Sequence, residues 1–162
     1  MAFIMSNHAD HQHVTAPAST WGMAVQATLH CLTGCAIGEV LGVVIGTALG
    51  WPVLPTVVLA IVLAFFFGYL LTMRGVLRAG VDFRRAARIA LAADTASIAI
   101  MELVDNLVLV GIPGAMDAGL NSALFWGSLA FSLAVAFVVT VPFNKWMIGR
   151  GRGHAVVHAH HH

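Results

Sequence analysis

The chain has 162 residues, of which only 15 are charged, eight basic and seven acidic. Apolar residue types make up 59% of the chain, and its mean hydropathy is +0.88. Soluble domains carry about 25% charged residues, so this composition excludes a soluble globular domain. Disordered proteins and nucleic-acid-binding proteins need far more charge, and both classes are excluded as well.

Four apolar stretches are long enough to cross a membrane as helices. The hydrocarbon core of a bilayer is about 30 Å thick, so a spanning helix needs about 20 apolar residues. The stretches lie at about 22–49, 53–73, 87–111 and 121–147. They lack the alternating pattern of a membrane barrel, and Gly and Pro residues separate the first from the second and end the third. The sequence therefore predicts an all-α integral membrane four-helix bundle.

The basic residues predict the orientation of this bundle. Five arginines lie in or beside the connection between the second and third stretches, and three more basic residues follow the fourth. They are Arg74, Arg78, Arg84, Arg85, Arg88, Lys145, Arg150 and Arg152. Positive residues stay on the cytoplasmic side, so both termini are expected in the cytoplasm. Each of the four tryptophans falls at a predicted helix end, the position that an amphipathic ring prefers.

The two ends of the chain are predicted to be polar tails around one membrane domain. Residues 1–20 have no basic segment followed by an apolar core, so they are not expected to be a cleaved signal peptide. The tail at 149–162 is basic and ends in a run of His. Flexible His tracts bind many metals weakly, and a terminal His run is also typical of an expression tag. The expected transmembrane domain covers residues 21–148.

A row of glycines on the first helix predicts close packing against another helix. The glycines recur at every fourth position, at 34, 38, 42, 46 and 50. Such a row drifts by about 40° per step and lets a second backbone approach closely. The partner is either another helix of this chain or a second copy, and Ser128 and Ser132 on the fourth helix offer a complementary small surface. A homo-oligomer assembled through small-residue faces is expected.

Four of the seven acidic residues fall within the predicted helices, at Glu39, Asp94, Glu102 and Asp105. A carboxylate at the bilayer centre costs about 2.5–3.5 kcal/mol. These groups must therefore face the bundle interior, bind a proton or coordinate a cation. On the third helix, Asp94, Met101 and Asp105 lie within about 40° of one another. Buried acids of this kind by default indicate an ion or proton pathway.

The first helix carries soft metal ligands next to one of these acids. Cys31, Cys35 and Glu39 follow one another at four-residue spacing, and His30 precedes them. Thiolate, imidazole and thioether groups suit Cu(I) and other transition metals, whereas carboxylates suit harder ions. The candidate metal ligands are His30, Cys31, Cys35, Glu39, Asp94, Met101, Glu102 and Asp105. The competing interpretation is that the cysteines pack as small residues and the His bonds a neighbouring helix.

The depth of these residues predicts two layers in the membrane. The first and third helices run in the same direction, from the cytoplasmic side outward. Counted from their cytoplasmic ends, His30 and Cys31 come near the depth of Asp94. The same count brings Glu39 near Glu102.

An enzymatic function is disfavoured, and no catalytic residue is assigned. The spacing of Cys31 and Cys35 is not the C-x-x-C of disulfide oxidoreductases, and bridging the two within one helix requires distortion. A haem needs two axial ligands, and only His30 lies in a predicted helix. The chain shows neither a phosphate-binding loop nor a nucleophile elbow.

Several sequence blocks contain the unusual polar residues of the chain. They are 30–35 (HCLTGC), 38–39, 94–106, 113–117, 125–128 and 151–155. Together, over about residues 28–158, they resemble a bacterial integral-membrane domain family of unknown function, some members of which are fused to multicopper oxidases. The resemblance implies a four-helix inner-membrane domain. The fusions favour copper by association only and imply a metal-handling partner such as a multicopper oxidase.

Composition, ligand set and resemblance lead to one expected function and two alternatives. We expect a multi-pass protein of the bacterial inner membrane that binds or translocates a transition-metal cation, with copper favoured. The first alternative is a structural or regulatory membrane subunit whose buried acids are protonated. The second is a proton-coupled transporter of small solutes. The expected partners are the lipid bilayer, further copies of the chain and a metal-handling protein, and no nucleic acid.

Overall fold

The computed structural model describes residues 20–150, which form four helices and no strand. The helices are α1 (Trp21–Ala48), α2 (Val53–Arg78), α3 (Phe83–Gly111) and α4 (Ala123–Gly149). The predicted all-α bundle is thereby confirmed. Three of these helices, α1, α2 and α4, are long and apolar enough to cross a membrane. The predicted tails fall almost entirely outside the described residues.

Helix α3 is as long as the others but less apolar. It carries six charged residues, namely Arg84, Arg85, Arg88, Asp94, Glu102 and Asp105. The three arginines lie near its beginning, while the three acids are buried further along the helix. Helix α3 therefore differs from the other three helices in having a basic beginning and an internal stripe of buried acids.

The connection between α2 and α3 is shorter than the apolar stretches predicted. Hydropathy identifies only the apolar part of a helix, whereas backbone hydrogen bonding here continues through the arginine-containing turns as far as Arg78 and back to Phe83. Gly80 turns the chain with a φ of 82°, which a glycine adopts without strain. Asp82 caps α3 by accepting a hydrogen bond from the Arg84 backbone N–H at 3.2 Å.

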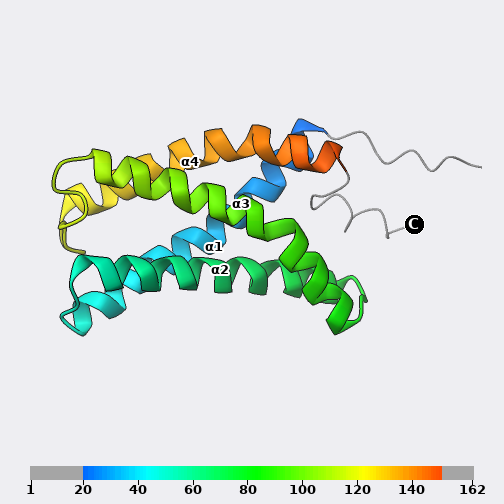
Figure 1. Cartoon of the computed structure of the whole chain (residues 1–162), viewed down its shortest axis with the longest axis horizontal. Coiled ribbons are helices and arrows are strands. Elements are labelled where there is room, and N and C mark those ends of the chain that lie inside the picture. The colour runs from blue at the N-terminus through cyan, green and yellow to red at the C-terminus, as the bar shows by residue number, and fades with distance from the viewer. Residues whose placement is uncertain (1–19, 151–162) are drawn as a thin grey trace, which may run out of the picture.

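Figure 1 shows α2 and α4 along opposite edges of the bundle, with α1 and α3 running diagonally across each other between them. The α1–α2 turn and the α3–α4 loop lie at one end of the molecule. The α2–α3 connection lies at the other end, together with the beginning of α1 and the end of α4. Helices α1 and α3 therefore run in the same direction, as predicted, and all the described basic residues lie towards the second end.

The glycine row of α1 packs against α2. A Cβ atom added to Gly42 would lie 2.5 Å from the Cα of Ala60, and one added to Gly34 would lie 2.7 Å from the backbone nitrogen of Gly68. The facing pairs are Gly34 and Gly68, Gly38 and Ala64, Gly42 and Ala60, and Gly46 and Thr56. Both helices thus contribute small residues at four-residue spacing, which is the pattern of a close membrane helix crossing.

Two details of the predicted glycine row are wrong. The complementary surface is on α2, and not the serine face of α4, because α2 presents its own small residues at the matching spacing. Gly50 lies beyond the end of α1, where it turns the chain with a φ of 64°. A Cβ atom added to Gly50 would have no neighbouring atom within 4 Å. Since α2 occupies the glycine face, a homo-oligomer would have to assemble through another surface.

The end of the bundle that carries the basic residues is closed by contacts between α1 and α4. The Asn144 amide donates a hydrogen bond to the Thr28 hydroxyl at 2.8 Å, and both side chains are buried. A small apolar cluster lies beside them, formed by Ala24, Ala27, Val141 and Ile148. Side chains therefore fill this end of the bundle.

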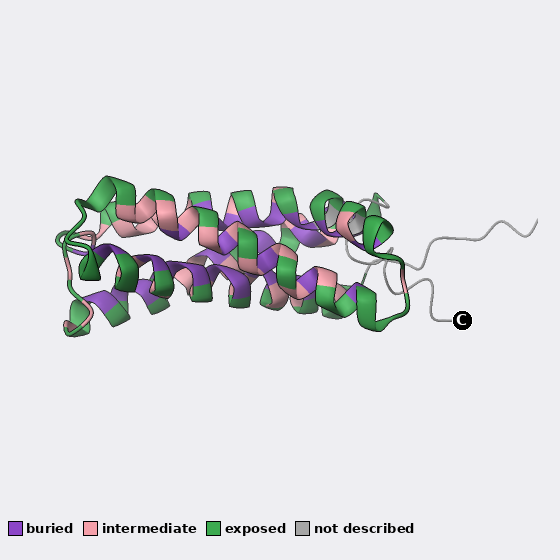
Figure 2. Cartoon of the chain, turned by 90° about the horizontal axis from the view of Figure 1, so that it is seen from below, coloured by how far each residue is buried: buried purple, intermediate pink, exposed green. Residues whose placement is uncertain are grey.

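The outer faces of the helices are apolar, and the buried polar residues lie inside. Figure 2 shows the buried residues as a stripe along the inward-facing sides of the helices. Leu54 is 74% exposed and Val138 is 68% exposed, while Asp94 and Asp105 are fully buried. This distribution suits a lipid solvent and is the reverse of that in a soluble domain.

Candidate functional site

Six buried ionisable side chains form a ladder between α1 and α3. Helix α1 supplies Cys31, Cys35 and Glu39, which lie about 6 Å apart along its axis. Each has an acidic residue of α3 as a neighbour. The pairs are Cys31 with Asp94, Cys35 with Glu102, and Glu39 with Asp105. We call these six residues the α1–α3 ladder, and none of them is more than 6% exposed.

The first pair of the ladder lies towards the end of the bundle that carries the basic residues. The Ser97 hydroxyl donates a hydrogen bond to the Cys31 sulfur at 3.3 Å, and the Asp94 carboxyl group of the same helix lies near enough to interact electrostatically with this thiol. His30 precedes Cys31 on α1 and is half-buried. Cys31 and Asp94 are therefore neighbours in the structure, as the predicted first layer requires.

The second pair lies beside an apolar core. Cys31 and Cys35 belong to one buried cluster with Met101, in which the other buried members are Ala64, Ile98 and Ala136. Both cysteines are free thiols. The Met101 side chain is 1% exposed and lies among these apolar groups. The middle of the ladder is consequently surrounded by side chains that provide few hydrogen-bond donors.

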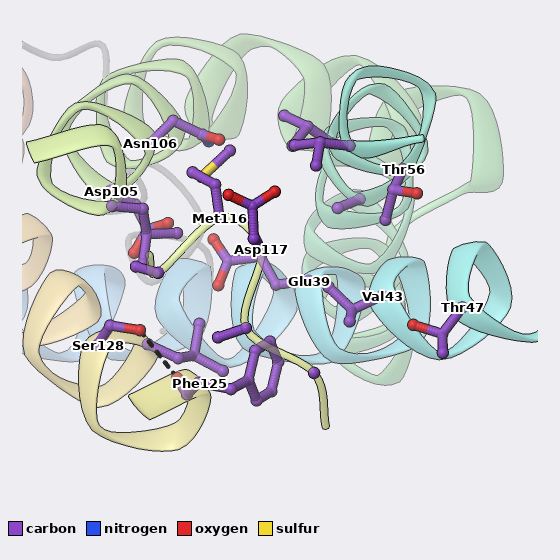
Figure 3. A pocket seen from close by; sticks show the side chains of 18 of the residues that line it. Glu39, Val43, Thr47, Thr56, Asp105, Asn106, Met116, Asp117, Phe125 and Ser128 are labelled. Atoms are coloured by element: carbon purple, nitrogen blue, oxygen red, sulfur yellow. Dashed lines mark hydrogen bonds between the residues drawn. The ribbon is translucent and has the colours of Figure 1, made fainter. Parts of the chain in front are cut away.

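The third pair opens into a cavity of about 470 Å³. Glu39, Glu102 and Asp105 line it from the helices, and Asp117 lines it from the α3–α4 loop. Figure 3 shows the side chains of Glu39, Asp105 and Asp117 directed towards a common space, with Met116 beside them. The cavity extends to Trp51 in the α1–α2 turn, so it lies at the end of the bundle opposite the arginines.

The hydrogen-bonding neighbours of Glu39 and Glu102 are another carboxyl group and a thiol, namely those of Asp105 and Cys35. In the described part of the chain, no backbone N–H, hydroxyl or amide donates to the buried carboxyl oxygens of Glu39 or Glu102. The Glu39 and Asp105 carboxyl groups are hydrogen-bonding neighbours, but one of them must carry a proton to act as a donor. Buried charges without partners are costly, so this pair requires a shared proton or a bound cation.

The predicted site residues form successive pairs, and they do not form one compact centre. Glu39 and Glu102 are neighbours, so the expected second layer is also present in the fold. Within residues 20–150, no group of three or more His, Cys, Asp or Glu side chains is placed to hold a metal ion. Metal binding by His30, Met101 and the ladder therefore stays a prediction.

Sequence reasoning did not assign three polar residues to the site. Ser97 lies three positions after Asp94, so helical spacing already placed it near the acidic stripe. The Ser132 hydroxyl neighbours Asp105, although its spacing suggested only a small packing surface. Asp117 lies in a loop, where no helical period relates it to the other acids, and only the fold brings it to the cavity.

Comparison with known proteins gives a family without an assigned activity. No curated protein and no solved structure matches the chain. One family model covers residues 20–153, a range that includes the whole ladder and every residue lining the cavity. The chain therefore belongs to the family described as a domain of unknown function, DUF4396.

Proposed function

We propose that this protein spans the bacterial inner membrane four times, with both termini in the cytoplasm. Three apolar helices and the exposed apolar outer faces support a membrane location. Helix α3 can be the fourth span because Asp94, Glu102 and Asp105 are buried inside the bundle, where lipid does not reach them. The gathering of the described basic residues at one end supports the orientation.

Within this membrane domain we propose that the α1–α3 ladder binds or translocates a transition-metal cation, with copper favoured. The observation that carries the proposal is the unbroken series of three buried pairs that ends at a cavity. The thiols of Cys31 and Cys35 are soft ligands, and the carboxylates of the third pair are harder ones. A cation moving along the ladder would advance about 6 Å at each step.

The charge balance of the ladder also supports a cation. The acids of α3 lie beside every α1 member of the ladder, and no basic side chain is a member. A positive ion would offset their charge within the low-dielectric interior, where unpaired carboxylates are unfavourable. His30 and Met101 would add nitrogen and thioether ligands near the thiols. Copper is favoured by association only, because the resemblance of the sequence blocks implies a family with some fusions to multicopper oxidases.

Metal analysis of the purified protein tests this proposal. We expect the wild-type protein, reduced and supplied with Cu(I), to retain copper through desalting. A Cys31→Ser/Cys35→Ser double variant should lose it, because the hydroxyl is a poor ligand for a soft ion. Thr33→Ser is the matched control on the exposed face of α1 and should bind as the wild type does. Absence of copper from the wild-type protein under these conditions would contradict the proposal.

A second candidate function is supported by the Glu39–Asp105 contact, which one proton satisfies. In this alternative the protein is a structural or regulatory subunit whose buried acids hydrogen-bond between helices, or it carries protons together with a small solute. A Glu102→Gln variant that keeps its fold and its assembly would favour the structural role. Proton flux into liposomes without metal, lost in Glu39→Gln, would instead favour a proton pathway.

A further inference from the structure

The cavity has properties that a metal pathway does not explain. Its volume of about 470 Å³ falls in the range of roughly 300–1,000 Å³ that is typical of sites for small organic molecules. A metal ion held at bond lengths of about 2 Å would fill little of this space. Apolar side chains from all four helices line much of it, among them Val43, Val57, Leu109, Phe125 and Leu129.

The charged groups of the cavity are all acidic, and they lie partly at its buried side. Glu39 is 6% exposed and Glu102 is 4% exposed, and among the described residues no backbone N–H, hydroxyl or amide donates a hydrogen bond to their carboxyl oxygens. Asp105 lines the same side, and Asp117 lies across from it on the loop. The lining, which is drawn from the described residues, includes neither Lys nor Arg. An anion is therefore disfavoured.

We propose that this cavity binds a small amphipathic organic ammonium ion. The ammonium group carries one positive charge and up to three N–H donors, and carboxylate oxygens accept such charge-assisted hydrogen bonds. It would lie between Glu39 and Asp105, with its apolar body against the walls formed by Val57, Leu109 and Phe125. This inference goes beyond the proposed metal function, because it requires neither a thiol nor a metal.

The chemistry of the cavity separates this ligand from the other candidates. A neutral apolar molecule, such as a lipid chain, would cover the walls but would offer the buried carboxyl groups neither a hydrogen-bond donor nor a positive charge. A bare metal ion would satisfy the carboxylates but leave the apolar walls unfilled. Asp117 on the loop provides an exposed charge near the opening, where it would attract an incoming cation before that cation reaches the buried pair.

Calorimetric titration of the full chain in lipid nanodiscs tests the proposal, with empty nanodiscs as the blank. The probe is n-hexylammonium, and 1-hexanol and hexanoate are the neutral and anionic controls of the same length. We expect saturable binding of the ammonium alone. Glu39→Gln should weaken it at least about tenfold, since a hydrogen bond to a charged group contributes about 1.5–3 kcal/mol.

A pair of valine variants tests the position of the ligand without altering charge. Val43→Phe adds a ring at the cavity wall and should abolish binding. Val44→Phe, the next residue and 41% exposed on the outer face of α1, should bind as the wild type does. Circular dichroism of each variant verifies that the helices are retained. Equal binding by the two variants, or equal binding of hexanol and hexylammonium, would overturn the proposal.

The same titration distinguishes this proposal from the metal function. The Cys31→Ser/Cys35→Ser variant should bind n-hexylammonium normally, because neither thiol is among the residues that line the cavity. Copper retention without ammonium binding would overturn this inference and leave the metal function in place. Ammonium binding by a protein that retains no copper would do the reverse.

Discussion

Glu39 and Asp105 meet at the cavity in an arrangement that two ionised carboxylates do not favour. Each is at most 6% exposed, and a hydrogen bond between them requires a proton on one. Packing alone gives no reason for an acid at either position, since an amide would make the same contact without the repulsion. Residues retained at such a cost in stability are typical of functional sites.

Replacing one acid of this pair should therefore stabilise the protein. In Glu39→Gln the amide N–H₂ can donate to Asp105 without an added proton, and the repulsion between the two carboxyl groups is removed. We expect the free energy of unfolding to rise by about 1 kcal/mol. Thermal unfolding in a mild detergent measures the change.

Asp117→Asn is the control for this substitution, because that residue is exposed on the loop and its replacement should change the unfolding temperature little. A Glu39→Gln protein that unfolds at a lower temperature than the wild type would show that the acid is there for stability.

At the scale of helices, the crossing of α1 and α2 depends on the absence of side chains from the α1 glycines. A Cβ atom added to Gly38 would meet the backbone of Ala64, which cannot move without shifting α2. We expect Gly38→Ala to destabilise the protein by about 1–3 kcal/mol, the usual cost of overpacking a close contact. Unfolding followed by circular dichroism would measure this loss.

Gly127→Ala provides the matched control for the helix crossing. It lies inside α4, and an added Cβ there meets nothing within 4 Å. Alanine is the better helix former by about 1 kcal/mol, so this variant should be as stable as the wild type or more stable. Equal destabilisation by the two alanine substitutions would show that the glycine row does not determine the α1–α2 contact.

Hydropathy and spacing predicted the helices and the inward-facing acids, but not which helices meet. The ends of α1 and α4 fall within two residues of the ends of the predicted stretches, because polar and turn-forming residues lie where these two helices end. Helix α2 extends to Arg78, since a helix can continue into the headgroup region where hydropathy falls. Four-residue spacing identified a small face on α1, but several helices carry small residues, and only three-dimensional packing selects α2.

The candidate site was predictable to the extent that it depends on helical geometry. Cys31, Cys35 and Glu39 share one face of α1 by spacing alone, and the common direction of α1 and α3 predicts the depth at which acids meet them. Asp117 could not be found in this way, because its approach to the cavity depends on the path of a loop. The cavity itself is lined by residues of all four helices and of both connections at one end, a combination that no local pattern encodes.

At the scale of the whole molecule, the two ends of the bundle differ in charge and in packing. One end carries the described basic residues and is closed by the hydrogen bond between Asn144 and Thr28. Trp21 lies under the Lys145 ammonium there, with 4.4 Å between Nζ and the ring centroid, as expected for an anchor at the headgroup level. The other end contains the acidic cavity. In the proposed membrane topology, a cation would meet an open acidic end on one side and a closed basic end on the other.

Single cysteines introduced at the two ends should react from opposite sides of the membrane. Ala79→Cys in the α2–α3 connection and Asn121→Cys in the α3–α4 loop both replace exposed residues. If the arginines face the cytoplasm, a membrane-impermeant maleimide should label Asn121→Cys in intact spheroplasts and Ala79→Cys only after lysis. The wild-type protein is the negative control, because Cys31 and Cys35 are buried. The opposite labelling pattern would place the cavity on the cytoplasmic side, so that the ladder would receive its cation from inside the cell.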